Sequence, residues 1–163
     1  MSDQSVADKL AIRDVLSKYC RGLDRMDKEM AYSVFSADCS VHYYDMFEGS
    51  GHGFVDWVWE AHAAMDRHSH QINNALIAVD GNTAVSEAYV TVVLWTAPPD
   101  ITEITCRGRY LDRWEKRADS WQIVRREHVL DTQSLNGVPV PDAVNQQSRR
   151  DDSDPSFKFI PRA

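Results

Sequence analysis

Cysteine is scarce in this chain of 163 residues, and the few present are not spaced for a shared role. Cys20, Cys39 and Cys106 are odd in number and far apart, which argues against a disulfide framework and a CxxC metal site. Long apolar runs are also missing, since no stretch approaches the roughly 20 residues that cross a bilayer. The first ten residues are acidic and polar, unlike a signal peptide. We therefore expect no membrane partner and a reducing, cytoplasmic location.

Positive charge is under-represented, with 18 Lys and Arg against 25 Asp and Glu and a net charge of −7. This excess of negative charge repels polyanions, so nucleic acid is not an expected partner. The sequence also lacks a serine nucleophile motif and a phosphate-binding loop. The glycine-rich stretch 49–53 has neither the spacing nor the lysine of such a loop. A hydrophobic fraction of 43% and a charged fraction of 26% instead indicate one soluble globular domain.

The first half of the chain is dominated by helical periodicity. Apolar residues recur three and four positions apart in two long stretches, which predicts amphipathic helices. Asp27 is a suitable N-cap for a short helix between them. The resulting prediction is helices at 5–25, 27–35 and 54–65, a strand at 39–44 and a loop at 47–53.

The second half changes to strand-like patterns separated by turn signals, which predicts antiparallel neighbours. Strands this long twist and curl, so the helices are expected to lie across a concave face and leave a cavity. The expected fold is a cone-shaped α+β domain over 1–135, followed by an extended polar tail over 136–163. The convex face also carries large side chains, which predicts a homo-oligomer, a trimer or a dimer, with the tail able to lie on a neighbouring subunit. The four strands are expected at 70–79, 84–96, 101–117 and 120–130.

Three short segments, in this order along the chain, resemble the SnoaL-like branch of the nuclear transport factor 2-like superfamily. They are Tyr19-Cys-Arg-Gly-Leu-Asp24, His70-Gln-Ile-Asn-Asn74 and Trp121-Gln-Ile-Val-Arg-Arg126. Within that branch the sequence is similar to bile-acid dehydratase and hexachlorocyclohexane dehydrochlorinase, and more distantly to scytalone dehydratase. The resemblance covers about residues 5–135 and implies a cystatin-like fold. It also implies that Asp24, His70, Arg126 and Tyr19 form the catalytic site.

The residues themselves leave two interpretations of Asp24 and His70 open. Asp24 falls at the edge of the apolar arc of its helix, where it can face the core or pair with Arg21 and Arg25 in solvent. His70 alternates in phase with apolar residues of its strand, including Ile72. A buried histidine there can bond to backbone, or to Asp24 as a general-base dyad.

Tyr19 and Arg126 are the other candidate catalytic groups. Tyr19 lies in the middle of the apolar arc, so its hydroxyl needs a partner and can donate to a substrate oxygen. Arg126 is in phase with Val124 and His128, opposite Trp121 and Ile123, and its fork can hold an anion or a carbonyl oxygen. The alternatives are plain core packing for Tyr19 and a surface pair with Glu115 or Glu127 for Arg126. The residues expected to contact the substrate are Tyr44, Trp57, Asn74, Tyr89, Tyr110 and His128.

The sequence does not predict a metal site, although it contains several histidines that could bind one. His68 and His70 share a strand face, and His42 could supply a distant ligand. However, no cysteine and no carboxylate at convincing spacing completes a ligand set. We therefore predict neither a metal nor a cofactor.

The function expected from these residues is a cofactor-independent dehydratase, other lyase or isomerase acting on a hydrophobic cyclic molecule. His70 would remove a proton from carbon, with Asp24 as its support. Two other classes remain open because fold alone does not give function. They are a non-catalytic small-ligand-binding module and a β-type structural subunit of a ring-hydroxylating oxygenase.

Overall fold

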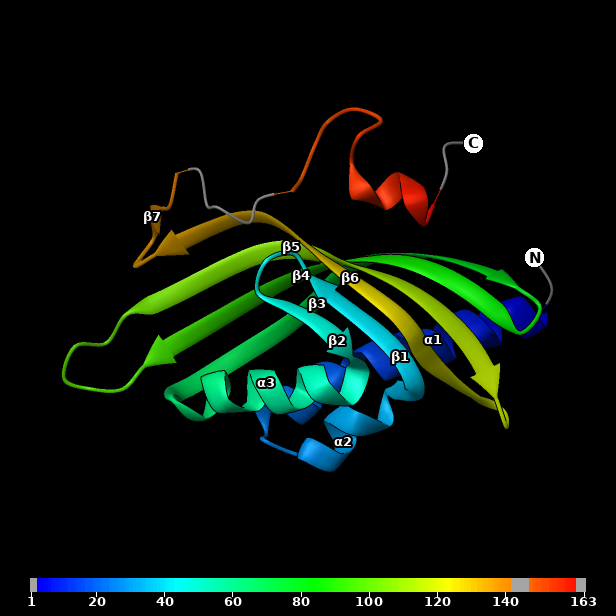
Figure 1. The fold of residues 1–163 in the computed structure, drawn as a ribbon, viewed down its shortest axis with the longest axis horizontal. Coiled ribbons are helices and arrows are strands. Elements are labelled where there is room, and N and C mark those ends of the chain that lie inside the picture. The colour runs from blue at the N-terminus through cyan, green and yellow to red at the C-terminus, as the bar shows by residue number, and fades with distance from the viewer. Residues whose placement is uncertain (1–2, 142–146, 161–163) are drawn as a thin grey trace.

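The computed structural model describes residues 3–141 and 147–160 (Figure 1). The first half contains α1 (Asp3–Asp24), α2 (Lys28–Ser33), β1 (Phe35–Tyr43), β2 (Phe47–Ser50) and α3 (Gly51–Ala63). The second half contains β3 (Met65–Asp80), β4 (Thr83–Thr96), β5 (Glu103–Arg117), β6 (Ser120–Leu135), β7 (Val138–Pro139) and a 3₁₀ helix at Pro155–Lys158. None of the helices in these described ranges has the length and apolarity to cross a membrane.

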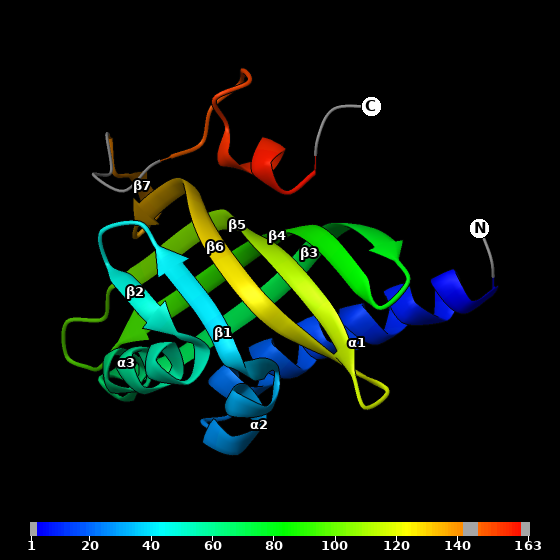
Figure 2. The same cartoon turned by 45° about the vertical axis from the view of Figure 1, so that its right-hand side comes forward.

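The strands form one curled sheet in the order β2-β1-β6-β5-β4-β3, with β7 paired to β6. Helices α1 and α3 lie across its concave face, as the two ribbon views show (Figures 1 and 2). The expected α+β architecture is therefore confirmed. The sheet is nevertheless mixed, because β1 pairs with β6 in parallel while every other pair is antiparallel.

The predicted glycine-rich loop at 47–53 is a strand followed directly by a helix. Ser50 caps α3 by accepting a hydrogen bond from the backbone N–H of Gly53 at 3.1 Å. Gly51 allows close packing at this point, because a Cβ there would lie 2.7 Å from the Cβ of Phe35. Phe35 itself begins β1, so the predicted second helix ends earlier than expected. Its predicted N-cap is confirmed, since Asp27 accepts from the N–H of Met30 at 3.0 Å.

Two irregularities break the strand periodicity that the sequence suggests. The β3–β4 register shifts between Ile72 and Ala75, so Ile77 is buried and Leu76 is 58% exposed. The β5–β6 register shifts beside Trp114, which pairs with Ile123 while Arg113 pairs with Arg125. Strand β6 therefore has one more residue than β5 between these two pairs. The extra residue places Ile123 on the same face as Arg126, so the prediction that they lie on opposite faces is wrong.

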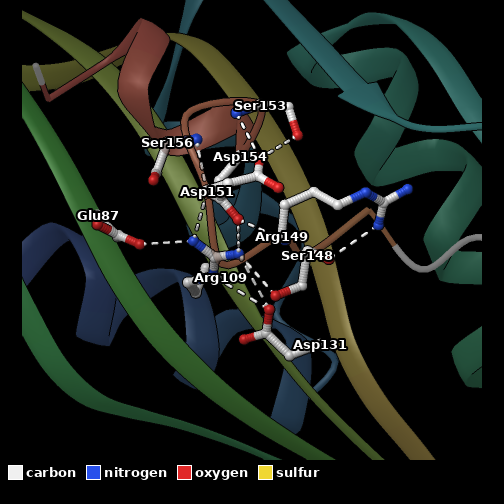
Figure 3. A network of polar contacts seen from close by, with 9 residues as sticks. All are labelled: Glu87, Arg109, Asp131, Ser148, Arg149, Asp151, Ser153, Asp154 and Ser156. Carbon is white, nitrogen blue, oxygen red and sulfur yellow. Dashed lines mark hydrogen bonds and ion pairs between the residues drawn. The ribbon is translucent and has the colours of Figure 1, made fainter.

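The tail folds against the convex face of the sheet (Figures 1 and 2). Phe159 packs with Leu111 and Val129, and Asp154 receives two hydrogen bonds of 2.9 Å from the guanidinium of Arg109. The same guanidinium contacts Glu87 and Asp131, which completes a polar cluster between sheet and tail (Figure 3). Part of the convex face is thus covered by the chain's own tail, and an oligomer remains a prediction.

Candidate functional site

A cavity of about 200 Å³ lies between α1, α3 and the concave face of the sheet. Its walls are mostly apolar and include Leu23, Phe54, Trp57 and Val58. Its polar lining residues in the described chain are Tyr19, Tyr43, His62, His70, Tyr110 and His128, and none of its lining residues there is Asp, Glu, Lys or Arg. The cavity therefore offers hydrogen-bonding groups to a ligand, but no Asp, Glu, Lys or Arg side chain among its described lining residues.

Asp24 and His70 meet at one end of this cavity. Asp24 is the last residue of α1, and His70 lies in β3. The Oδ1 atom of Asp24 lies 2.7 Å from Nδ1 of His70, and both carboxylate oxygens accept the backbone N–H of His70 at 3.0 Å. The hydrogen bonds from the backbone N–H fix the Asp24 carboxylate relative to β3. The carboxylate then fixes the orientation of the His70 imidazole through its contact with Nδ1. With Nδ1 donating to Asp24, Nε2 is left as the ring atom that can accept a proton.

Two further histidines surround this pair. His68 Nδ1 lies 3.3 Å from the same Oδ1 of Asp24. His62, from α3, packs its ring 4.5 Å from that of His68 and 5.2 Å from that of His70, measured between centroids. His62 was not predicted, although its position four residues after Val58 places it on the buried face of α3.

The electrostatics of this end favour an ionised carboxylate beside neutral imidazoles. Burial disfavours the Asp24 charge, but hydrogen bonds from the ring and backbone of His70 outweigh it and hold the pKa of Asp24 below its ordinary value. Burial also lowers the pKa of His68, against the opposing hydrogen bond to Asp24. Burial and the neighbouring histidines lower the pKa of His62 to about 3. An ionised Asp24 can orient the His70 ring by accepting a hydrogen bond from its Nδ1.

Another part of the cavity wall is a cluster of tyrosines that pack against a buried arginine. Tyr19, Tyr43 and Tyr110 are all at least 93% buried. The guanidinium carbon of Arg126 lies 4.4 Å from the ring centroid of Tyr19 and 4.1 Å from that of Tyr110. Burial raises the pKa of each of these three phenols, so they are O–H donors at neutral pH.

Arg126 is held from behind by Asp112. Its Nε and Nη2 atoms donate to the two carboxylate oxygens at 2.7 and 2.8 Å, and neither side chain is exposed. The expected alternative, a surface pair with Glu115 or Glu127, is therefore wrong. Arg126 is not among the residues that line the cavity. Its Nε and Nη2 bond to Asp112, whereas its Nη1 is buried without a hydrogen-bond partner among the described residues. The positive charge lies directly behind the rings of Tyr19 and Tyr110.

The residues expected to contact substrate divide into two groups. Trp57, Tyr110 and His128 line the cavity, as do Tyr19 and His70. Tyr44, Asn74 and Tyr89 lie outside it, and their predicted role is corrected. Tyr44 is 43% exposed in a turn, where its φ is 44°. Asn74 is exposed because it sits in the β3 irregularity, and Tyr89, 46% exposed, points to the convex face beside the tail.

Acid is expected to destabilise the fold through the buried histidines of the cavity. Burial, together with the nearby Arg126, lowers the pKa of His128 to about 3, as burial does for His62. The unfolded chain therefore binds more protons between pH 6.5 and 3, and stability falls as pH drops through that window. At about 1.4 kcal/mol per pKa unit, each histidine contributes on the order of a few kcal/mol.

The measurement is the melting temperature of wild type, His128→Phe and the control His52→Gln, from pH 7 to pH 4. His128→Phe removes the titrating group and retains a ring to stack on Tyr43, which His128 approaches to 4.6 Å. We expect this variant to lose less stability in acid than wild type, whereas the exposed His52 variant follows wild type. Equal slopes for all three proteins would refute a buried neutral His128.

Comparison with known proteins identifies the family and the fold. The family model described as the SnoaL-like domain matches residues 4–127. An uncharacterised protein of Mycobacterium tuberculosis is 23% identical over 128 residues, which cover 77% of this chain and 87% of the relative. The family match at 4–127 runs from α1 into β6.

Solved structures give the same picture. A candidate scytalone dehydratase from Novosphingobium aromaticivorans superposes with a TM-score of 0.74 at 23% identity, covering 82% of this chain and 91% of that one. A type 2 hexachlorocyclohexane dehydrochlorinase superposes with a TM-score of 0.73 at 15% identity, covering 91% and 99%. The cystatin-like fold implied by the sequence resemblance is confirmed. The family match extends over three quarters of the sequence, and the chain belongs to the SnoaL-like domain family.

Proposed function

We propose that the protein is a cofactor-independent lyase or isomerase that removes a proton from carbon in a small cyclic molecule. The observation that carries this proposal is the Asp24–His70 pair, joined at 2.7 Å at the wall of a largely apolar cavity. His70 Nε2 acts as the general base, and Asp24 holds the tautomer and stabilises the imidazolium that forms. The dehydratase and dehydrochlorinase names among the structural neighbours support a role in small-molecule catalysis or binding.

The tyrosine cluster supplies the complementary electrophilic group. Tyr19 and Tyr110 present phenol donors backed by the positive charge of Arg126. Tyr43 adds a third buried phenol beside Tyr19 and Tyr110, and its hydroxyl can donate to an oxygen of the substrate. Donors placed where negative charge develops stabilise an enolate-like oxyanion or a departing anion. Arg126 acts in this proposal through the phenols it touches, as a positioning residue.

The cavity limits the substrate. An engineered protein cavity of about 150 Å³ holds benzene, so about 200 Å³ fits one substituted ring. A charged ligand would lose its hydration without meeting an opposite formal charge among the described lining residues, which is costly. We therefore propose an uncharged, monocyclic substrate with one oxygen or halogen function and an acidic C–H bond.

The test uses a panel of uncharged monocyclic β-hydroxy ketones, cyclic enones and chlorinated cyclohexanes in D₂O. Compounds that raise the melting temperature are incubated with protein, and mass spectrometry detects elimination or uptake of deuterium at carbon. We expect at least one compound to react with wild type and not with Asp24→Asn. Binding without exchange or elimination across the panel would instead support the non-catalytic binding module.

A further inference from the structure

Asp24, which contacts His70 at the cavity wall, belongs to a donor set suited to a metal ion. We propose that Asp24, His68 and His70 form a binding site for Zn²⁺. One carboxylate oxygen and one nitrogen from each ring all lie within 4.8 Å of one another. The spacing of residues in the sequence does not predict this donor set, because its carboxylate comes from α1, 44 residues before His68 in the chain.

The distances between the donors suit tetrahedral coordination. Zn²⁺ binds nitrogen and oxygen at about 2.0–2.2 Å, which places tetrahedral ligand atoms about 3.3 Å apart. The Asp24 Oδ1 atom lies 3.3 Å from His68 Nδ1 and 2.7 Å from His70 Nδ1. The His68 contact already has the tetrahedral separation, and the His70 contact has to widen by about 0.6 Å to admit the ion. The donor atoms of the two rings lie within 4.8 Å of each other, so these side chains can converge on one ion with a small movement. Two imidazoles and one carboxylate are the donor types that borderline divalent ions prefer.

The surroundings of the three donors also favour an ion. The side chains of His68 and His70 are only 5% and 4% exposed, and that of Asp24 is 12% exposed, so little ordering is needed on binding. Three protein ligands leave a fourth position for water or a further donor. His62 lies against both rings and is 94% buried, and its Nδ1 has no hydrogen-bond partner in the part of the chain that the structure describes. A buried nitrogen without a partner beside this donor set is an independent sign that a ligand completes the site.

An ion has a route to the donors. Asp24 and His70 line a second pocket, between α1 and β3, together with Ser17 and Cys20. Arg21 and Arg25 line the same pocket and oppose the approach of a cation, so the site is expected to bind Zn²⁺ less tightly than a dedicated structural site.

Zinc at this site would also change the role of His70, a consequence that rests on the proposed function. Coordination through Nδ1 requires the lone pair of that atom, so the ring proton moves to Nε2. The atom proposed to accept a proton from substrate would then be a donor. Zn²⁺ is therefore expected to inhibit any turnover that depends on His70 as a base.

The test is titration of chelator-treated full-length protein with ZnCl₂, followed by calorimetry. We expect one Zn²⁺ per chain in wild type, at least tenfold weaker binding in His68→Ala, and unchanged binding in His52→Ala, a control at an exposed histidine. Circular dichroism verifies that each variant is folded. No saturable binding in wild type, or equal affinity in folded His68→Ala, would overturn the proposal.

A second measurement needs no variant. Long-range ¹H–¹⁵N NMR of wild type should show the Nδ1 signals of His68 and His70 shifting on addition of one equivalent of Zn²⁺. Shifts confined to other histidines would overturn the site. Binding at these atoms in a protein that turns over no ligand would count against the proposed function alone. Turnover that depends on His70, in a protein that binds no Zn²⁺, would count against the metal site alone.

Discussion

Replacing His70 with alanine is expected to lower turnover by about 10²–10⁴-fold, the usual contribution of a positioned general base. The alanine leaves the tyrosine cluster in place but removes the imidazole ring. Among the described residues, His70 is the histidine that both lies 2.7 Å from Asp24 through Nδ1 and lines the cavity. Asp24→Asn is expected to cause a loss of the same order. An asparagine can donate to Nδ1 and thereby move the ring proton to Nε2. The measurement is kcat/KM on whichever compound the exchange screen identifies.

The matched control for Asp24→Asn is Asp14→Asn, an exposed acid on the same helix. It changes the net charge equally and should leave turnover unchanged. Thermal melts would establish that all three variants are folded. Wild-type turnover in folded His70→Ala would remove the base from the mechanism, and normal turnover in Asp24→Asn would remove its partner.

Replacing Arg126 with methionine is expected to cost about 3–5 kcal/mol of unfolding free energy, the range for breaking a buried ion pair from one side. Both Arg126 and Asp112 are fully buried, and their two hydrogen bonds satisfy the carboxylate. Burial already raises the pKa of Asp112, against the opposing charge of Arg126. Without Arg126 the carboxyl would have to take up a proton or remain as an unpaired buried charge.

Urea denaturation measures this loss of unfolding free energy directly. Two further variants serve as controls. Arg117→Met breaks the solvent-accessible contacts of an arginine with Asp38 and Glu115, and should cost far less stability than Arg126→Met. Arg126→Met combined with Asp112→Leu removes both charges and should recover most of the stability lost in the single variant. A cost below about 1 kcal/mol for Arg126→Met alone would mean that the pair is not buried as described.

The sequence predicted most elements because their periodicity is local. Helix α1 and the long strands follow repeats of 3.6 and 2 that survive in the structure. The predictions failed where a single residue shifts the register. The irregularity beyond Ile72 turned Asn74 outward, and the one beside Trp114 turned Ile123 inward. Neither shift has a glycine or proline at the point where it occurs, so the pattern alone carried no signal for it.

Non-local pairing was the second limit. The parallel pairing of β1 with β6 joins residues about 85 positions apart in the chain, and no turn in the sequence indicates it. The packing of the tail on the sheet could not be predicted either, because it depends on the ion pair of Asp154 with Arg109, which are far apart in the sequence. The proximity of Asp24 and His70 was predicted, because the family resemblance implied it. His62 was missed because a buried histidine on a helix looks like any other polar residue until its neighbours are known.

The central claim is that Asp24 holds the proton of His70 on Nδ1 and leaves Nε2 free as a base within the cavity. Long-range ¹H–¹⁵N NMR on ¹⁵N-histidine-labelled protein reads this directly, without a substrate or a metal. Near neutral pH, His70 should show a protonated Nδ1 and an unprotonated Nε2, and Asp24→Asn should reverse or scramble that pattern. A wild-type His70 with its proton on Nε2 would contradict the claim.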